Sequence, residues 1–580
     1  MFKKHYRHLQ IPLTSHVDDL PEKLRQRLEN SWAGIFYREV YSRIDEAPFA
    51  ELYADCPSRP NVPVNVLVGL EYLKAGHGWS DEELYDHFCY DIQVRYALGY
   101  RQLGEGDFDL RTLYYFRERL SRHMQEKGVN LLDQAFEKVT DAQLKAFQIK
   151  TGKQRMDSVQ VSSNIRQMGR VQLLVEVLQR VERMLSQDDQ FRYAEAFAPY
   201  LKGHAGHYVY RMKDEEVAPH LQRIGEFMQR LLIELQPAYG SQVVYQVLER
   251  VFSEHFSTEQ TRVSAKPNTE LSASCLQSPD DLEATYREKR GIGYRGYVAN
   301  LTETCDPENQ LQLITKVQVA PNNTDDDQLL AEALPNLKAR TALNEMNTDG
   351  GYGGRQSDPL LAQYQVELVQ TAIRGRNPNP DQPHLADFEI RFGENGKPRQ
   401  VTCPAGQKVS VQPSGQQKSF VAHFELSLCQ ACPLFAENKC LAQAGKQTDP
   451  RLRLRFTLAE AQAAQRRRRC AENKQRSGNL RAAVEATVRS VKLPFPEAQL
   501  PVRGEFRVTC MLIGSAAVAN VRRIQRYLQA RLQAEMRQKA ILNQQDCAQD
   551  TLAPSFLGFM RHIFARFLKS ALAFQPVWAC

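Results

Sequence analysis

The chain has 580 residues, of which 42% are hydrophobic and 25% charged, with a formal net charge of +7. This composition is typical of a globular protein, and the length calls for roughly two to four domains. No apolar run reaches the roughly 18 residues of a membrane-spanning helix, and the basic N-terminus lacks the apolar segment of a signal peptide. Twelve cysteines are too few for a disulfide scaffold of this size, so we expect a cytoplasmic protein with no membrane partner.

Residues 1–145 are predicted to form a helical domain. Apolar residues recur at helical spacing in 64–73, acids follow Ser80 as in a first helical turn, and Asp109 precedes a third helical segment. Basic residues interleaved with aromatic ones gather around that segment: Arg101, Arg111, Arg117, Arg119, Arg122 and His123. This pattern suits contact with nucleic acid, and a charged helix face exposed to solvent explains it equally well.

The segments 147–150 and 154–161 are predicted to form one strand with a bend at Gly152. Asp157 lies inside the second segment, where strand propensity disfavours an acid. We therefore expect either a capping role at a loop edge or a carboxylate held at the edge of a sheet. Residues 164–289 follow as a helical insertion in which the sequence shows no chemistry.

Two further strands, 293–301 and 311–319, are predicted to pair as an antiparallel hairpin with Asn309 in the turn. The three acids 325–327 then precede a helical pattern. Because acids at a helix N-terminus are explained by the helix macrodipole, we assign them no role as ligands.

The next predicted strand, 341–348, ends at Asp349 in a glycine-rich turn that runs to Gly354. Glycines allow a sharp turn and the close approach of a ligand. An acid after such a strand lies where open α/β sheets place their binding sites, although a plain Asp-Gly turn is the alternative. One more strand is predicted over 366–372.

A cysteine-containing segment, 376–456, holds Cys403, Cys429, Cys432 and Cys440. The two residues between Cys429 and Cys432 give the spacing of a zinc knuckle, and the other two could complete a set of four thiolates. Reduced cysteines that only pack are the alternative.

The segment 458–469 is predicted to be a helix ending in four arginines, Arg466, Arg467, Arg468 and Arg469. A run of like charges is usually a solvated face. Four consecutive arginines beside the following helix need a counter-charge, and we favour DNA phosphate in this role.

Residues 478–492 are predicted to form a helix. Arg481 and Glu485 are four residues apart and share a face, to which Lys492 returns about two turns later. One acid between two bases fits either an exposed ion pair or a metal-binding carboxylate flanked by cations that bind phosphate.

The segment 507–512 is predicted to be a last strand or the apolar start of a long helix over about 514–543 that packs on the core. Residues 546–580 are amphipathic with a basic face. We expect this tail to dock on its own protein or on a second protomer rather than on a membrane.

Asp157, Asp349 and Glu485, delivered by strand, strand and helix, match a two-metal site of hard oxygen ligands. The chain here resembles the DDE transposases of bacterial insertion sequences, which have an RNase H-like core. The resemblance rests on Gln154–Ser158, Asn347–Tyr352, Arg481-x3-Glu485-x6-Lys492, Tyr115–Leu120 and Ala519–Ile524. Gly478 stands where the family signature has a tyrosine, so the role of that tyrosine is not carried over.

The resemblance implies a mixed α/β fold in which an all-α N-terminal domain precedes an RNase H-like core with helical and cysteine-containing insertions. The expected parts are 1–145 (DNA-binding domain), 146–163 and 290–375 (first part of the core), 164–289 and 376–456 (insertions), 457–545 (last part of the core) and 546–580 (tail).

The resemblance also implies Mg²⁺-dependent cleavage and transfer of DNA strands. Asp157, Asp349 and Glu485 would hold two Mg²⁺ ions, or Mn²⁺, while Arg481 and Lys492 would contact phosphates. The expected partners are double-stranded DNA, as element ends and target, and a second copy of the chain in a synaptic complex at the nucleoid. The alternatives are a Mg²⁺-dependent nuclease on the same core without strand transfer, and a non-catalytic DNA-binding protein derived from a transposase.

Overall fold

The computed structural model divides the chain into two units, Met1–Val521 and Arg522–Cys580, and each is described by itself. The residues that it describes are 1–6, 15–54, 60–210, 212–260, 262–373, 379, 382–393, 396–415, 419–444, 451–475 and 480–551. Helices make up 52% of the structure and strands 17%, which confirms the predicted mixed α/β class.

The N-terminal part is helical, as predicted. Its helices are α1 (Glu22–Glu29), α2 (Trp32–Glu39), α3 (Val64–His77), α4 (Asp81–Tyr90), α5 (Ile92–Ala97), α6 (Arg111–Lys127) and α7 (Leu131–Ala146). α3 is buried along nearly its whole length, which explains why apolar residues surround it on every side. α4 begins with a capping box, in which the Ser80 hydroxyl accepts the Glu83 N–H at 3.1 Å and the Glu83 carboxylate accepts the Ser80 N–H at 2.8 Å.

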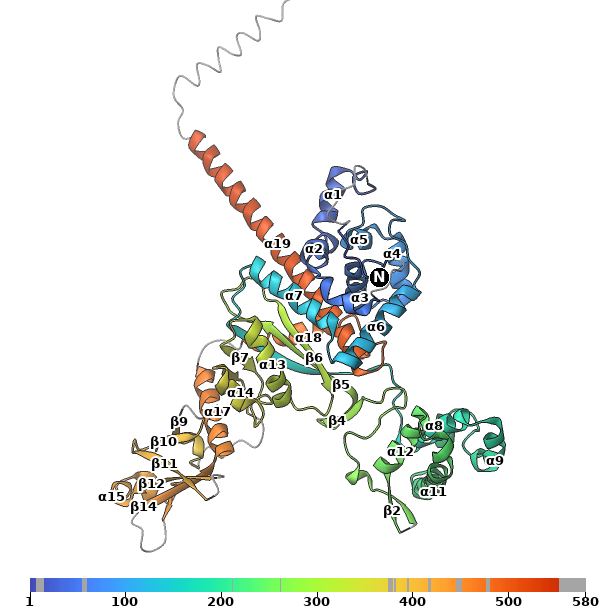
Figure 1. Cartoon of the computed structure of the whole chain (residues 1–580). Coiled ribbons are helices and arrows are strands. Elements are labelled where there is room, and N and C mark those ends of the chain that lie inside the picture. Colours follow the sequence, from blue (N-terminus) through green and yellow to red (C-terminus); the bar gives the residue numbers. More distant parts are fainter. Residues whose placement is uncertain are drawn as a thin grey trace, which may run out of the picture. The chain divides into compact units, whose positions relative to one another are not determined.

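A mixed six-stranded sheet lies within the unit Met1–Val521 (Figure 1). Its strands are β1 (Lys153–Val161), β4 (Thr285–Lys289), β5 (Ile292–Thr304), β6 (Ile314–Pro321), β7 (Glu345–Thr348) and β8 (Glu367–Gln370). Their order is β4-β5-β1-β7-β8, with β6 paired along the edge of β5 that faces away from β1. β1 is antiparallel to β5 and parallel to β7, and β7 is parallel to β8. The predicted hairpin is confirmed by the antiparallel pairing of β5 with β6.

The strand predicted over 147–150 is wrong, because β1 begins only at Lys153. The segment instead leaves the end of α7, where Gln148 has a φ of 52°. Left-handed backbone of this kind ends a helix and does not fit a strand.

One face of the sheet is covered by α13 (Asp326–Arg340) and α14 (Ser357–Gln363). Leu330 and Leu334 of α13 share a buried core with Met156 of β1 and Met346 of β7. This burial fixes the start of α13 relative to the ends of β1 and β7, where the predicted acids lie.

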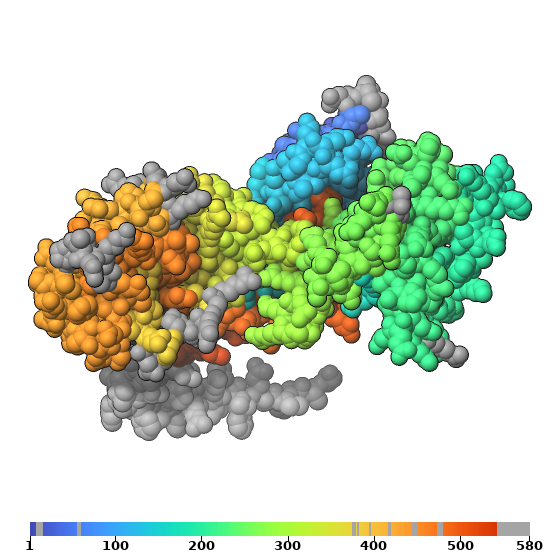
Figure 2. Space-filling view, turned by 90° about the horizontal axis from the view of Figure 1, so that it is seen from below, coloured from blue at the N-terminus to red at the C-terminus, as the bar shows by residue number. Residues whose placement is uncertain are grey.

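The helical insertion between β1 and β4 has a core of its own, which α8, α11 and α12 dominate. Its elements are α8 (Arg170–Met184), α9 (Gln187–Phe197), α10 (Ala205–Val209), α11 (Asp214–Tyr239), α12 (Val243–His255) and the hairpin of β2 (Phe256–Glu259) and β3 (Arg262–Ala265). Figure 2 shows this insertion in green as a lobe of the surface.

The cysteine-containing segment forms a second antiparallel sheet with its own apolar core, which was not predicted from the sequence. Its elements are β9 (Glu389–Phe392), β10 (Pro398–Thr402), β11 (Lys408–Ser414), β12 (Ser419–Glu425), α15 (Leu426–Cys429), α16 (Pro433–Ala436), β13 (Gln443–Ala444) and β14 (Arg451–Thr457). We call this region, 385–457, the cysteine sheet.

Three helices follow, α17 (Leu458–Gln475), α18 (Val484–Lys492) and α19 (Glu505–Thr551). The segment 507–512 lies inside α19, so its prediction as a strand is wrong and its prediction as the apolar start of a helix is right. Most of the predicted amphipathic tail, 552–580, lies outside the described residues. Among the described helices, none is both long and apolar enough to span a membrane.

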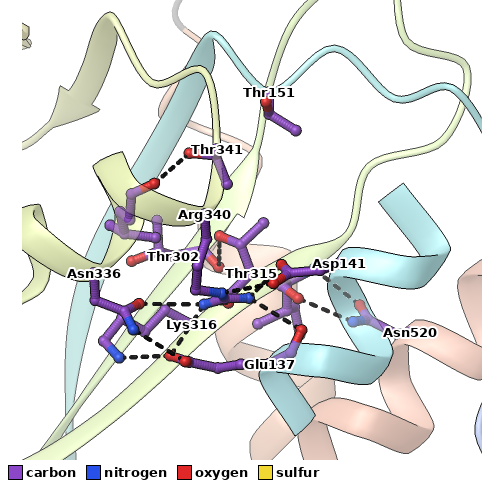
Figure 3. A network of polar contacts seen from close by, with 12 residues as sticks. Glu137, Asp141, Thr151, Thr302, Thr315, Lys316, Asn336, Arg340, Thr341 and Asn520 are labelled. Atoms are coloured by element: carbon purple, nitrogen blue, oxygen red, sulfur yellow. Dashed lines mark hydrogen bonds and ion pairs between the residues drawn. The ribbon is translucent and has the colours of Figure 1, made fainter. Parts of the chain in front are cut away.

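A polar network joins α7 to the strand β6 and to the helix α13 (Figure 3). Arg340, at the end of α13, binds Asp141 with its Nη2 atom 2.7 Å from Oδ1, and its Nη1 atom lies 3.0 Å from Glu137 Oε1. Lys316 of β6 reaches the same Glu137 oxygen at 2.9 Å, and Asn336 donates to the other at 3.0 Å. Because these side chains are largely buried, the network fixes α7, β6 and α13 to one another.

The end of β6 is also held by α19. Asn520 donates from its amide nitrogen to the Ile314 carbonyl at 3.0 Å, and its amide oxygen accepts the Ile314 N–H at 2.9 Å. This two-bond contact replaces the ladder partner that β6 lacks on that side.

Substitution of Arg340 by Met should lower the free energy of unfolding by about 2–4 kcal/mol, because Glu137 and Asp141 lose a buried partner. Chemical denaturation followed by circular dichroism measures this loss. Arg122→Met is the matched control, since its ion pair with Glu118 is about 60% exposed on both sides and should contribute less than about 1 kcal/mol. Equal effects of the two substitutions would contradict this role of the network.

Candidate active site

Asp157 lies in the middle of β1, opposite Leu301 of β5, rather than at a loop edge. Its side chain is 12% exposed, and its Oδ2 atom accepts a hydrogen bond from Arg481 Nη2 at 3.2 Å. Burial raises the pKa of Asp157, and the negative charge of Asp349 raises it further, while Arg481 opposes both. The carboxylate is therefore held in a site that disfavours its charge unless a cation is near.

Asp349 follows β7 directly, at the same end of the sheet to which β1 runs, because the two strands are parallel. Its Oδ1 atom accepts the Gly351 N–H at 2.8 Å, and Gln370 of β8 donates to its carbonyl at 3.1 Å. Tyr352 anchors the turn, because its buried hydroxyl donates to Asn300 of β5 at 2.7 Å. The predicted glycine-rich turn is thus a fixed loop that presents Asp349.

A further acid, Asp326, joins these two and was not predicted from the sequence. Its Oδ1 atom accepts the Ser158 hydroxyl at 2.7 Å, next to Asp157 in β1. Burial raises the pKa of Asp326, and the charge of Asp349 adds to the effect. A β-carbon on Gly351 would lie 2.6 Å from Asp326 and 3.1 Å from Asp349, so this position needs a glycine to let the two acids approach the loop.

The neighbouring Asp327 has a different role. Its carboxylate accepts the N–H groups of Gln356 and Ser357 at 3.0 and 2.9 Å, and it packs on Gly354. The first turn of α13 therefore holds the loop after Asp349, in addition to any effect of the macrodipole. The signal available in the sequence was the position of these acids shortly after β6, the strand that pairs with β5.

The third predicted acid lies on α18, which begins at Val484 rather than at 478. Residues 480–483 form a turn, and Gly478 lies outside the described residues. Arg481 therefore belongs to the turn and binds Asp157, instead of sharing a helix face with Glu485. Glu485 is exposed in the first turn of α18, and Lys492 is its last residue, where burial lowers the pKa of the ammonium group.

A buried acid of β5, Glu303, fixes this helix to the sheet. Its carboxylate accepts Arg155 Nε at 2.6 Å and the Thr487 hydroxyl at 2.7 Å. Arg155 also donates to the Leu480 carbonyl at 2.7 Å. The turn that carries Arg481 and the helix that carries Glu485 are thus attached to β1 and β5, two residues along β1 from Asp157.

Hard carboxylate oxygens are the ligands that Mg²⁺ prefers, so Asp157, Asp326 and Asp349 fit a divalent cation. In the described part of the chain, no three of the acids named above have carboxylate oxygens that all lie within 4.8 Å of one another. The structure therefore brings Asp157, Asp326 and Asp349 into one electrostatic cluster, while Glu485 lies on an adjacent element.

The four cysteines of the cysteine sheet line one cavity of about 310 Å³, together with Gln407 and apolar side chains. The Gln407 N–H donates to Cys403 at 3.3 Å, and the Cys429 thiol donates to the Gln407 side chain at 3.7 Å. Burial raises the pKa of Cys429, and the other three cysteines, Cys440, Cys403 and Cys432, add to this. The predicted gathering of the four thiols is present, although among the described residues no three of their sulfur atoms lie within 4.8 Å of one another.

The four consecutive arginines of α17 have different surroundings. Arg466 forms an ion pair with Asp358, and its side chain packs on Gly353 in the loop after Asp349. Arg468 lies 3.3 Å from Glu472. Arg466 therefore anchors α17 to the site, which makes it a weaker candidate for DNA contact than Arg467 and Arg469.

In the basic cluster of the N-terminal domain, Arg117 is an internal partner. It contacts Glu71 at 2.8 Å and Asp81 at 2.7 Å. The charged-face alternative describes this residue better than contact with nucleic acid does.

Comparison with protein-family models gives two matches, which lie on either side of the strands that carry Asp157 and Asp349. Residues 402–525 match the family described as "Transposase DDE domain", and residues 22–119 match "Transposase domain (DUF772)". The chain is similar to the DDE-type transposases of insertion sequences over these two ranges. No curated protein and no solved structure matches it significantly.

The match over residues 402–525 includes Arg481, Glu485 and Lys492, as well as the four cysteines. The second covers most of the N-terminal helices, from α1 into α6. The part of the cysteine sheet from residue 402 onward is therefore covered by the transposase family model, while β9 and most of β10 precede the match.

Substitution of Asp326 by Asn tests the acid cluster without removing the acceptor for Ser158. Because the folded-state pKa of Asp326 is raised, its ionisation destabilises the fold, and stability is lost as the pH rises through that pKa. In chelator at neutral pH, Asp326→Asn should raise the Tm by about 2–4 °C, and the difference should vanish as the pH falls to where carboxyl groups are protonated. Differential scanning calorimetry measures both effects.

Asp325→Asn, at the exposed neighbouring residue, is the control and should leave the Tm unchanged. A lower Tm for Asp326→Asn than for the wild type would show that the Asp326 charge stabilises the fold.

Proposed function

We propose that the chain cleaves DNA at the ends of an insertion sequence and joins them to target DNA, with Asp157, Asp349 and Glu485 as the metal-binding acids. The observation that carries this proposal is that Asp157 and Asp349 both lie just beyond the stretch where β1 and β7 pair in parallel, where burial and the charge of Asp349 raise the pKa of Asp157. The relation to transposases makes DNA the substrate class.

The proposed cofactor is a pair of Mg²⁺ ions, with Mn²⁺ as a substitute. Bound at these acids, the ions would activate a water or a 3′-hydroxyl for attack on a phosphodiester and stabilise the leaving oxygen. Asp326 adds a carboxylate from a separate element, so the acids of the site come from β1, the start of α13, the end of β7 and α18.

Arg481 acts as the counter-ion of Asp157 when no other cation is close. Once the charge of Asp157 is neutralised otherwise, the same guanidinium is available to a DNA phosphate, for which its planar set of donors is suited. Lys492 lies on the same helix as Glu485, and its ammonium forms no hydrogen bond or ion pair within the described part of the chain. We assign both to the positioning of phosphates.

Arg467, Arg468 and Arg469 extend the proposed DNA contact along α17, because this helix packs against the loop after Asp349 through Arg466. We expect a homodimer in the synaptic complex. We also propose that Cys403, Cys429, Cys432 and Cys440 bind a structural zinc ion, since all four line one cavity and thiolates are the preferred ligands of such sites.

The second candidate function is a Mg²⁺-dependent nuclease on the same core. It uses the same acids for hydrolysis and differs only in its products, because joined strands arise from a transposase alone. A non-catalytic DNA-binding protein is the third reading, and it predicts binding without metal-dependent products.

Asp157→Asn, Asp349→Asn and Glu485→Gln should each lower the rate of cleavage by at least roughly 10³-fold, because each removes a charged metal ligand. Labelled linear DNA carrying the element's own ends, with and without Mg²⁺, measures cleavage and joining, and a gel shift measures binding. Binding should stay within about twofold of the wild type.

Glu332→Gln, on the exposed side of α13, is the matched control and should cleave normally. A variant at one of the three acids that keeps full cleavage removes that acid from the site. Cleavage without joined products in the wild type favours the nuclease.

Replacing Arg467, Arg468 and Arg469 together by Ala should flatten the salt dependence of DNA binding. The log–log slope should fall by about 0.9 for each phosphate that these arginines neutralise in the wild type. Arg466 is left in place because its removal would disturb the loop of Asp349. Fluorescence anisotropy over a series of salt concentrations gives the slope.

The matched control is the double substitution of Arg192 and Arg230, two exposed arginines that flank Glu234 in the helical insertion. An unchanged slope for the α17 variant, or an equal change in the control, would place the α17 arginines away from the DNA.

A further inference from the structure

The helical insertion contains a cluster of metal-ligating side chains that the proposed function does not use. Glu254 and His255 end α12, and Cys275 lies in the loop that follows β3. One ligand atom from each residue lies within 4.8 Å of the ligand atoms of the other two. Among the described residues, this is the one group of three or more His, Cys, Asp or Glu side chains whose ligand atoms lie this close together.

His255 is the unexplained member of this cluster. The residue is 4% exposed, and neither of its ring nitrogens has a hydrogen-bond partner among the described residues, although both are buried. Buried polar atoms in native proteins are almost always paired, so two orphaned nitrogens on one ring point to a missing partner. A metal ion takes one imidazole nitrogen directly, in its neutral form.

The backbone around the cluster is fixed by contacts that leave the ligand atoms in place. Glu254 accepts the Leu276 N–H at 2.8 Å, which ties the residue after Cys275 to α12. Arg250 donates to the other Glu254 oxygen at 2.8 Å, and Arg170 donates to the His255 carbonyl at 2.7 Å. Each carboxylate oxygen keeps a lone pair for a further ligand bond, because it accepts one hydrogen bond here.

We propose that Glu254, His255 and Cys275 bind a zinc ion. Thiolate, imidazole and carboxylate together are a donor set that Zn²⁺ favours over harder ions such as Mg²⁺. In a tetrahedral zinc site, bond lengths near 2.0 and 2.3 Å place ligand atoms about 3.3–3.8 Å apart. The ligand atoms of the present cluster lie within 4.8 Å of one another, so binding needs them to approach by at most about 1.5 Å. The Glu254 carboxylate and the Cys275 thiolate together balance the double positive charge of the zinc ion. This balance matters because the cations Arg170 and Lys266 lie close to His255.

Three protein ligands leave the fourth coordination position of a tetrahedral zinc ion free. We expect this position to face the cavity beside the cluster. His255 and Cys275 line a cavity of about 710 Å³ that also reaches Asn323 and Asp325, directly before α13. A water molecule from this cavity completes the site. The ion then links the end of α12 to the loop of Cys275, at the border between the helical insertion and the central sheet.

The test measures metal in the full-length protein, in a background where Cys429→Ser and Cys432→Ser remove the other cysteine cluster. The background protein should hold about one zinc ion per chain. Further substitution by His255→Gln or Cys275→Ser should remove it, while Cys89→Ser, at a partly exposed cysteine of α4, should leave it unchanged.

Exchange of the metal for Co²⁺ gives a second readout that does not depend on the folding of these variants. The background protein should develop one thiolate-to-cobalt absorption band that saturates at one equivalent of Co²⁺. A folded background protein, as judged by circular dichroism, that holds no zinc and gives no such band would overturn the proposal. Retention of the ion in folded His255→Gln and Cys275→Ser variants would do the same. Neither result depends on DNA cleavage.

Discussion

The structure depends on the parallel pairing of β1 with β7, which brings Asp349 close enough to the buried Asp157 to raise its pKa. Like charges there repel, and burial makes the repulsion stronger. The surrounding contacts oppose it from three sides, through the Arg481 guanidinium on Asp157, the Gly351 N–H on Asp349 and the Ser158 hydroxyl on Asp326. The same arrangement that costs stability without a bound cation would favour the binding of one, as we propose.

The elements around the site are held by polar contacts that carry no chemistry of their own. Glu303 fixes α18 to β5, and Asp327 fixes the loop after Asp349 to the start of α13. The end of α13 is held in turn by the ion pairs of Arg340 with α7. The position of Asp326 is therefore set at both ends of its helix, by α7 at one end and by the loop after Asp349 at the other.

The sequence singled out Asp157 and Asp349, because an acid inside an apolar strand and an acid before four glycines are both unusual in their local setting. The structure brings the two acids into electrostatic contact, and their role as metal ligands stays a prediction. Asp326 was not found, since acids at a helix N-terminus have a sufficient local explanation. The start of α18 was misplaced for a related reason: Arg481 leaves the helix to bind Asp157, and that partner is 324 residues away. The cysteine sheet was not predicted, because the prediction for this segment rested on the spacing of its cysteines. The alternation of buried and exposed residues in strands such as Arg451–Thr457 is the signal that indicates a sheet.

α17 connects two regions that have separate apolar cores. It leaves β14 of the cysteine sheet, buries Ala461 and Ala464 in the core of that sheet, and reaches Gly353 with the side chain of Arg466. A stiff helix clamped at both regions is a lever, because it cannot bend to absorb a rotation at one end. A tilt of the cysteine sheet would thus be passed to the backbone next to Asp349, so a region with a core of its own would influence the position of that acid.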